Sequence, residues 1–261
     1  MVANKFFSEG FDSPDLSLPY GQDALIDAVA TANPNTIVVL QTGNAVSMPW
    51  RGRVKAIVQA WYAGEAGGQP MAEVLAGKVN PSGRLPVTFY ANIEQTPHPQ
   101  LAGFGTPQNT PTNLKYHEGS DVGYRWLART STKPNYAFGH GLSYTSFAYS
   151  DLKVSGGETV TATFTVTNTG ARAGADVPQI YMLGVGKTKR MRLLGFERVE
   201  LQPGESRTVT VTADPRLLAR FDGKAQQWRI TGGNHKIALA KSADAPVLTA
   251  QIRLQSRLFG N

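Results

Sequence analysis

The segment TIVVLQ at residues 36–41 is the clearest strand signal in the first half of the chain. A continuous β-branched run of this length is typical of a strand buried on both faces of a parallel sheet. Residues 21–31 (GQDALIDAVAT) precede it and predict a helix whose apolar face carries Leu25, Ile26, Val29 and Ala30. Residues 54–61 predict the next strand, and residues 68–75 predict a second helix that ends near Gly77. Strands that alternate with helices in this way indicate an α/β domain built on a parallel sheet.

The second half has a different pattern, with short strand-like segments and no convincing helix. The predicted strands cover residues 159–167, 177–182, 192–201, 206–213, 228–231, 236–240 and 248–254. Seven short strands separated by turn residues indicate an immunoglobulin-like β-sandwich. Residues 94–112 are polar and proline-rich and predict a long loop. We therefore divide the chain into an α/β domain (1–93), a loop and connector (94–149) and a β-sandwich (150–261).

The α/β domain is expected to be incomplete. Only a few residues precede position 10, which leaves little sequence for a first strand, and two or three strands make a poor independent core. Residues 1–93 therefore resemble the latter part of a larger α/β domain. An unpaired sheet edge and an apolar face near residues 1–60 would favour such a partner domain over an independent module.

Composition excludes several classes of protein. Of 261 residues 41% are hydrophobic and 17% are charged, which is globular composition, and cysteine is absent. Disulfide scaffolds, thiolate metal sites and cysteine nucleophiles are thereby excluded. No apolar run is long enough to span a bilayer, and the first residues lack the pattern of a signal peptide, so we expect no membrane partner.

The net charge of +7 lies entirely in the second half, where residues 150–261 carry 16 basic and 9 acidic side chains. Its densest part contains Lys187, Lys189, Arg190, Arg192 and Arg198, opposed by Glu197. Such a cluster can bind phosphates or anionic glycans. Because Phe196 is the only aromatic residue within it, we interpret it as a solvated hairpin and expect no nucleic-acid partner.

Motifs for metals and cofactors are weak. The four histidines, His98, His117, His140 and His235, include no i, i+4 pair, so we expect no metal site and no cofactor. Residues 64–68 (GEAGG) lack the ending of a phosphate-binding loop. Residues 139–143 (GHGLS) do not match a nucleophile elbow, and we interpret them as a backbone turn with a packed or hydrogen-bonded His140.

Two groups of carboxylates are candidates for acid–base chemistry. Glu9 lies between Ser8 and Gly10, close to three phenylalanines, and apolar neighbours raise a carboxyl pKa as a general acid requires. Glu118 and Asp121 form a second polar group with aromatic neighbours. The residues alone do not rank these two groups, and either also fits a plain surface turn.

Seven segments resemble glycoside hydrolase family 3, in particular its β-glucosidases, in the order of that family. They are residues 8–26, 36–50 (TIVVLQTGNAVSMPW), 56–68 (AIVQAWYAGEAGG), 77–89 (GKVNPSGRLPVTF), 116–126 (YHEGSDVGYRW), 136–154 and 193–206. The resemblance implies a barrel domain followed by an α/β sandwich and a fibronectin type III-like domain. This chain matches the latter part of the sandwich and the fibronectin-like domain.

The resemblance also implies a function. The family removes terminal β-linked sugars with retention, using an Asp nucleophile from the barrel and an acid/base Glu from a sandwich loop. That loop matches residues 8–12, so the resemblance assigns the acid/base role to Glu9, with Asp12 as the alternative. Trp50, Trp61 and Glu118 are weaker candidates for substrate binding, since core packing also explains the two tryptophans. The implied partners are a β-glucoside or oligosaccharide substrate and a barrel domain or chain of the same enzyme, and the implied location is periplasmic or extracellular.

The matched region contains no barrel, so we expect little or no glycosidase activity from these 261 residues alone. A fragment, one chain of a split enzyme and a degenerate gene product all fit this expectation. The alternative function is a non-catalytic module that binds polysaccharide or a partner protein through the basic half.

Overall fold

The computed structural model describes residues 1–7, 13–107 and 110–260. These residues form two compact units. The N-terminal unit comprises residues 1–79, 87–127 and 132–136, and the C-terminal unit comprises residues 80–86, 128–131 and 137–261. Within the described ranges, no helix has the length and apolar character needed to cross a membrane.

A parallel sheet of three strands organises the described part of the N-terminal unit, with the order β1-β2-β3. Its strands are β1 (Val2–Lys5), β2 (Ile37–Thr42) and β3 (Ala56–Gln59). The predicted strand at 36–41 is confirmed as the central strand, where Val38, Val39 and Leu40 are all buried. The expectation that the first residues are too few for a strand is wrong, because Val2 to Lys5 pair with Val39 to Thr42.

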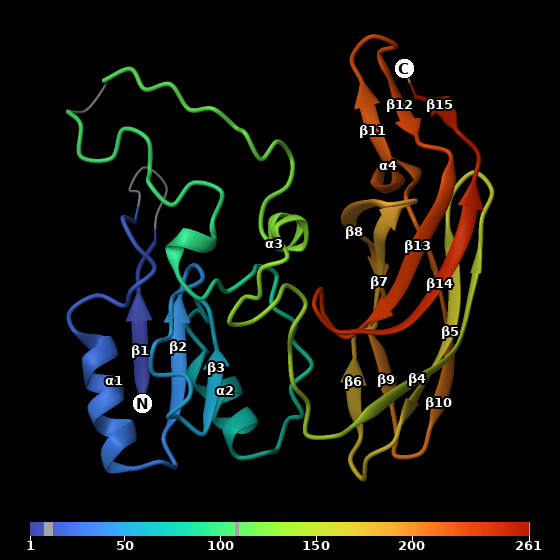
Figure 1. The fold of residues 1–261 in the computed structure, drawn as a ribbon. Helices are drawn as coiled ribbons and strands as arrows, with labels where there is room; N and C mark the ends of the chain where they lie inside the picture. The colour runs from blue at the N-terminus through green and yellow to red at the C-terminus, as the bar shows by residue number, and fades with distance from the viewer. Residues whose placement is uncertain (8–12, 108–109, 261) are drawn as a thin grey trace. The chain divides into compact units, whose positions relative to one another are not determined.

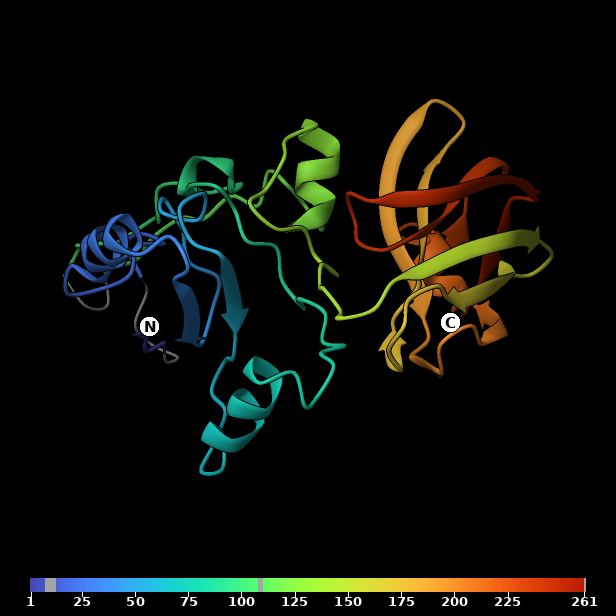
Figure 2. The same ribbon diagram turned by 90° about the horizontal axis from the view of Figure 1, so that it is seen from below.

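The two predicted helices are present as α1 (Gln22–Ala32) and α2 (Gly68–Leu75), and the three strands lie between them (Figures 1 and 2). Ile26 and Ala30 of α1 are buried as expected, whereas Leu25 and Val29 on the same predicted face are exposed. No side chain of α2 is buried. A three-stranded sheet offers too little surface to cover both helices, which agrees with an incomplete α/β domain.

The remainder of the N-terminal unit is mostly irregular. The 3-10 helix η1 (Ile93–Gln95) opens the proline-rich segment, and α3 (Tyr124–Thr130) follows it. The described residues between them form turns and bends, which confirms the predicted loop. The indole nitrogen of Trp126 in α3 donates to the carbonyl oxygen of Gln95 at 3.0 Å, so the two ends of this segment are joined.

The C-terminal unit is a β-sandwich, as predicted. Its two larger sheets have the orders β10-β5-β4 and β14-β13-β7-β8, and smaller sheets pair β6 with β9 and β11 with β12 and β15. The strands are β4 (Phe147–Ser155), β5 (Thr161–Asn168), β6 (Gly174–Asp176), β7 (Gln179–Val185), β8 (Thr188–Phe196), β9 (Val199–Leu201), β10 (Ser206–Thr212), β11 (Ala219–Asp222), β12 (Gln227–Ile230), β13 (Gly233–Ala240), β14 (Pro246–Leu254) and β15 (Arg257–Phe259). A single-turn helix, α4 (Pro215–Leu218), precedes β11.

Strict alternation along β5 shows how the sequence builds the sandwich. Ala162, Phe164 and Val166 are buried in the core. The intervening threonines face outward, and the hydroxyls of Thr161 and Thr163 form cross-strand hydrogen bonds of 3.1 Å with threonines of β10. Such pairs each add roughly 0.2–1 kcal/mol to the stability of a sheet. The period-two pattern therefore fixes both the face and the register of these strands.

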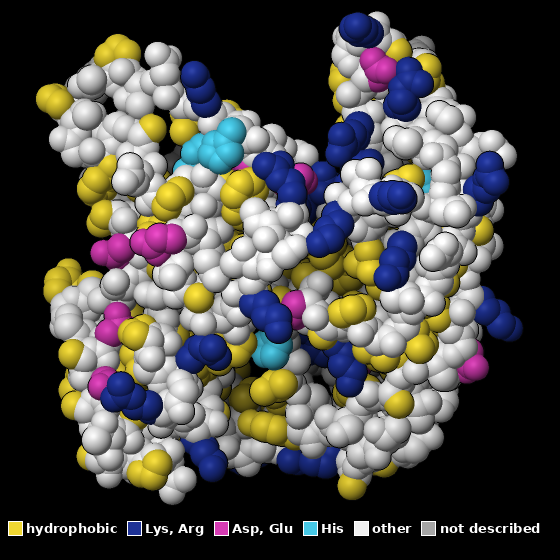
Figure 3. Space-filling view, in the orientation of Figure 1, with side chains coloured by type: hydrophobic (Ala, Val, Ile, Leu, Met, Phe, Trp, Pro, Cys, Tyr) yellow, Lys and Arg dark blue, Asp and Glu magenta, His cyan; other side chains and the backbone are white. Residues whose placement is uncertain are grey.

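The basic segment on β7 and β8 is indeed a hairpin, but it is only partly solvated. Lys187, Lys189 and Arg198 are exposed, whereas Arg190 and Arg192 are buried. The guanidinium of Arg190 donates to the carbonyl oxygens of Leu218 and Ala219 at the end of α4. Two of the five cations are therefore buried, and Arg190 forms a tertiary contact. Figure 3 shows Lys and Arg side chains at the surface of the sandwich.

Two of the matched sequence segments fold onto each other within the C-terminal unit. The amide of Leu85 donates to the carbonyl oxygen of His140, and the amide of Gly139 donates to that of Leu85. A Cβ at Gly141 would overlap the carbonyl oxygen of Gly83. The predicted backbone turn is confirmed at its start, where the amide of His140 donates to the carbonyl oxygen of Ala137, and the close approach of a second backbone requires glycine at position 141.

A buried ion pair anchors residues 80–86 to the sandwich. Arg84 Nη2 donates to Asp176 Oδ1, and the hydroxyl of Tyr149 donates to Asp176 Oδ2 at 2.6 Å. Burial raises the pKa of Tyr149, and the adjacent Asp176 carboxylate raises it further. The hydroxyl is therefore a permanent hydrogen-bond donor, and the carboxylate is satisfied on both oxygens.

Candidate functional site

The carboxyl edge of the parallel sheet is the first candidate site. Since β1, β2 and β3 are parallel, Lys5, Thr42 and Gln59 end at the same edge. Ligands of open α/β sheets bind outside the carboxyl ends of the strands. Glu9 and Asp12, the predicted acid/base candidates, follow β1 but lie outside the described residues.

The chain on the N-terminal side of Glu9 is held in place by a residue that follows β3. The hydroxyl of Tyr62 accepts from the amide of Phe7 at 2.7 Å and donates to the carbonyl oxygen of Phe7 at 3.3 Å. The ring of Tyr62 also stacks on Phe6, with 6.1 Å between centroids. A single side chain therefore fixes the backbone just before the predicted acid/base loop.

The chain on the other side of the loop is also fastened to the end of β1. The Lys5 ammonium donates to the carbonyl oxygens of Asp15 at 3.1 Å and Ser17 at 2.7 Å. The described residues that flank the predicted loop on both sides consequently lie at the carboxyl edge. Phe6, one of the three phenylalanines near this loop in sequence, is 80% exposed.

Two further features mark this edge as unusual. Gln59 Nε2 donates to the backbone and hydroxyl oxygens of Thr42, while Gln59 Oε1 is buried with no hydrogen-bond partner among the described residues. Trp61 has a φ of 54°, a left-handed conformation that is strained for a bulky side chain. Strained backbone and unsatisfied buried polar atoms both tend to gather at functional sites.

The two tryptophans proposed as weak substrate contacts have different surroundings. Trp50 is 1% exposed, and its indole nitrogen donates to Asp23 Oδ1 of α1 at 2.7 Å, so it belongs to the core. Trp61 is only partly buried, and its ring packs against Phe89 at 6.1 Å. Of the two, only Trp61 retains accessible surface near the carboxyl edge.

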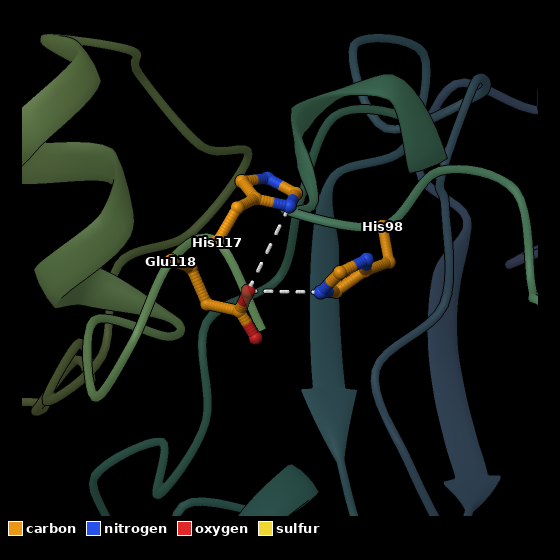
Figure 4. A group of neighbouring side chains, drawn as sticks. All are labelled: His98, His117 and Glu118. Carbon is orange, nitrogen blue, oxygen red and sulfur yellow. Dashed lines mark hydrogen bonds and ion pairs between the residues drawn. The ribbon is translucent and has the colours of Figure 1, made fainter. Parts of the chain in front are cut away.

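Glu118 belongs to a second cluster, which it forms with His98 and His117 (Figure 4). His98 Nε2 lies 2.9 Å from Glu118 Oε2, and His117 Nδ1 lies 4.0 Å from the same oxygen. The carboxylate is nearly fully buried, whereas the side chains of His98 and His117 are 24% and 55% exposed. The cluster is therefore a buried carboxylate covered by two partly accessible imidazoles.

Electrostatics keep this carboxylate ionised. Burial raises the pKa of Glu118, but hydrogen bonds from its own backbone amide and from His98, together with the positive potential of both imidazoles, place the pKa below its ordinary value. An ionised carboxylate can only accept hydrogen bonds, so His98 carries its proton on Nε2. Asp121, the other carboxylate of this sequence group, is not among the three clustered side chains.

Sequence reasoning missed two participants in these sites. Tyr62 was not selected, although it directly follows a tryptophan at the end of a predicted strand. The i, i+4 spacing rule passes over His98, which meets Glu118 although 20 residues separate the two along the chain. A spacing rule for metal ligands detects only ligands on one regular element. His98 and Glu118 lie on different irregular segments, so the rule does not find them.

Comparison with known proteins agrees with this architecture. The family model described as the glycosyl hydrolase family 3 C-terminal domain matches residues 1–144. The chain belongs to glycosyl hydrolase family 3. A fibronectin type III-like domain matches residues 176–243 and accounts for the sandwich. The resemblance inferred from the seven segments and the predicted fold class are both confirmed.

The similar proteins are β-glucosidases. Beta-glucosidase B of Emericella nidulans is 41% identical over 97% of this chain and 32% of its own length. Thermostable beta-glucosidase B of Acetivibrio thermocellus is 37% identical over 98% of this chain and 34% of its own length. The chain thus spans about a third of these relatives.

Solved structures give the same result. A β-glucosidase from Streptomyces venezuelae in complex with D-glucose is 39% identical, with a TM-score of 0.85 over 97% of this chain and 33% of that one. Beta-glucosidase 3B from Thermotoga neapolitana is 34% identical, with a TM-score of 0.88 over 100% of this chain and 38% of that one. In both, the counterpart of this chain is one portion of a larger protein.

Proposed function

We propose that this chain forms the C-terminal part of a retaining β-glucosidase that removes terminal β-D-glucosyl residues from the non-reducing end. Glu9 is its general acid/base, and Asp12 is the alternative. The nucleophile is an Asp on a barrel domain outside this sequence. The observation that carries the proposal is the position of the flanking residues: Phe7, Lys5 and Asp15 lie at the carboxyl edge of the sheet of a family 3 domain.

The chemistry requires a carboxyl group that changes role between two steps. In the first, Glu9 gives its proton to the glycosidic oxygen as the barrel Asp attacks the anomeric carbon, which forms a glycosyl-enzyme and releases the alcohol. In the second, the Glu9 carboxylate takes a proton from water, and the resulting hydroxide displaces the Asp. Retention requires the two carboxyl groups to lie roughly 5–5.5 Å apart, so the loop after β1 must be held accurately.

The contacts described above suit that demand. Tyr62 binds both backbone polar groups of Phe7, and Lys5 binds two carbonyl groups beyond Asp12. The exposed aromatic surface of Phe6 beside Tyr62 is available to pack against the barrel or the sugar. Such anchoring from rigid strands is what keeps a catalytic group within range of its substrate.

The test joins this chain to the portion of the Streptomyces venezuelae β-glucosidase that it does not cover. Hydrolysis of an aryl β-glucoside by the fusion is compared with hydrolysis by the isolated chain, which is expected to be inactive. In the fusion, Glu9→Gln should lower kcat by about 10²- to 10⁴-fold, the usual contribution of general acid–base catalysis. The loss should be smaller for aryl leaving groups of low pKa, which need less protonation.

Asp12→Asn is the matched control, because it removes a carboxylate three residues away in the same loop. A large loss with Asp12→Asn and none with Glu9→Gln would transfer the role to Asp12. An active fusion that tolerates both substitutions would refute the assignment to this loop. Activity of the isolated chain would refute the placement of the nucleophile on the barrel.

A further inference from the structure

We infer that His98, His117 and Glu118 form a binding site for one divalent transition-metal ion, with Zn²⁺ as the best match. The three ligand atoms, His98 Nε2, His117 Nδ1 and Glu118 Oε2, all lie within 4.8 Å of one another. In a tetrahedral zinc site, with bonds of about 2.0–2.2 Å, neighbouring ligand atoms are roughly 3.3 Å apart. The distances of 2.9 Å and 4.0 Å to Oε2 bracket that value.

The nature of the ligands selects the metal. Two imidazole nitrogens and one carboxylate oxygen suit Zn²⁺, Cu²⁺ and Ni²⁺, whereas Ca²⁺ and Mg²⁺ require more oxygen ligands. When the ion binds His98 Nε2, the proton on that nitrogen moves to Nδ1 by way of solvent. The charge of the ion is then opposed by a nearly fully buried carboxylate.

Aromatic packing holds the two imidazoles over the carboxylate. The rings of His98 and His117 meet edge to face at 4.8 Å, and the ring of Trp126 packs against His117 at 5.9 Å. The indole of Trp126 also binds the carbonyl oxygen of Gln95, three residues before His98. The loop carrying one ligand and the turn carrying the other two are thus tied to the same helix.

The cluster is accessible to an ion from solvent, and one of its ligands can adjust its position. Both imidazoles are partly exposed, so an ion can reach them from solvent, and water is expected to supply the fourth ligand of a tetrahedral ion. The more exposed His117 can rotate to close the longer distance, while the buried carboxylate stays fixed. This arrangement lies within the N-terminal unit and is independent of the role of Glu9.

The experiment titrates the untagged chain with ZnCl₂ by isothermal calorimetry, after treatment with a chelator. We expect one ion per chain with a micromolar or lower Kd, unaffected by excess Mg²⁺. Loss of one ligand should weaken binding by about 100-fold or more, because changes to residues that only orient a ligand already weaken metal binding by roughly 10- to 100-fold. His98→Gln and His117→Gln test this separately, and both remove partly exposed rings.

His140→Gln is the control, since it removes a histidine outside the cluster. Co²⁺ supplies an independent readout, because a tetrahedral site gives it a strong visible absorption that both ligand variants should lose. The inference would be overturned if the unsubstituted chain did not bind Zn²⁺. A less than tenfold effect of either ligand substitution, or an equal effect of His140→Gln, would also overturn it.

Discussion

The buried ion pair between Arg84 and Asp176 predicts that a single substitution, Arg84→Met, causes a large loss of stability. The side chains of Arg84 and Asp176 are only 13% and 4% exposed, and Tyr149 supplies the remaining hydrogen bond. Arg84→Met keeps most of the aliphatic stem but leaves the Asp176 carboxylate buried without a counter-charge. Breaking a buried pair in this way costs about 3–5 kcal/mol.

The neighbouring substitution and an exposed pair set the scale. Tyr149→Phe removes one hydrogen bond from the carboxylate and should cost about 1–3 kcal/mol. Arg198 and Glu200 form an ion pair of 2.7 Å in the same unit, but their side chains are 53% and 70% exposed. Arg198→Met should therefore cost about 0–1 kcal/mol.

Hydrogen exchange of the slowest amides in β5 and β10 measures the free energy of unfolding of the C-terminal unit alone. A cost of 3–5 kcal/mol corresponds to exchange that is faster by roughly 150- to 5,000-fold. The free energy from exchange should fall in the order Arg198→Met, Tyr149→Phe, Arg84→Met. If Arg84→Met accelerates exchange no more than Arg198→Met, the claim that burial makes this pair indispensable is refuted.

Two further predictions concern the pH dependence of stability and the contact of Tyr62 with the backbone just before the acid/base loop. Burial lowers the pKa of His235 and the Arg190 guanidinium lowers it further, against a hydrogen bond to a backbone carbonyl that raises it. The unfolded chain therefore binds a proton more readily, so the free energy of unfolding of the sandwich should fall as the pH drops below about 6.5. In His235→Gln the free energy of unfolding should fall less steeply between pH 7.5 and 5 in the same exchange measurement. Burial also lowers the pKa of His140, which therefore contributes a fall of the same sign in both proteins. If the two curves are parallel, the role of His235 is contradicted. Tyr62→Phe removes both hydrogen bonds to Phe7 from a half-exposed side chain. In the fusion enzyme it should lower kcat about tenfold while thermal stability changes little, and an unchanged kcat would show that Tyr62 does not position the acid/base loop.

Much of the fold could be predicted because its pattern is local. Apolar periodicity predicts the buried strand at 36–41, the helix before it and the alternating strands of the sandwich. Strand β1 was missed because four residues carry too little periodicity, and it exists only by pairing with β2. Leu25 and Val29 of α1 were expected to be buried, yet periodicity indicates only an apolar face and not whether anything covers it.

The candidate sites were less predictable, since their members are brought together by long-range packing. Trp50 and Trp61 look alike in sequence, but one is buried against α1 and the other borders the carboxyl edge. Arg190 and Arg192 belong to a basic cluster in sequence, but the strand that carries them turns both into the interior. The spacing of residues along the chain does not indicate which of them meet through such long-range contacts.

Sequence motifs and periodicity were enough to identify the family and the order of the two kinds of domain, because both are properties of neighbouring residues. They also led to the proposal that residues 8–12 carry the acid/base group. The tertiary structure alone decided that Tyr62 and Lys5 fasten both sides of that loop, and that His98 meets Glu118. Such contacts join segments as much as 55 residues apart. Their energy depends on burial and on the precise placement of the two groups, which only the folded chain defines.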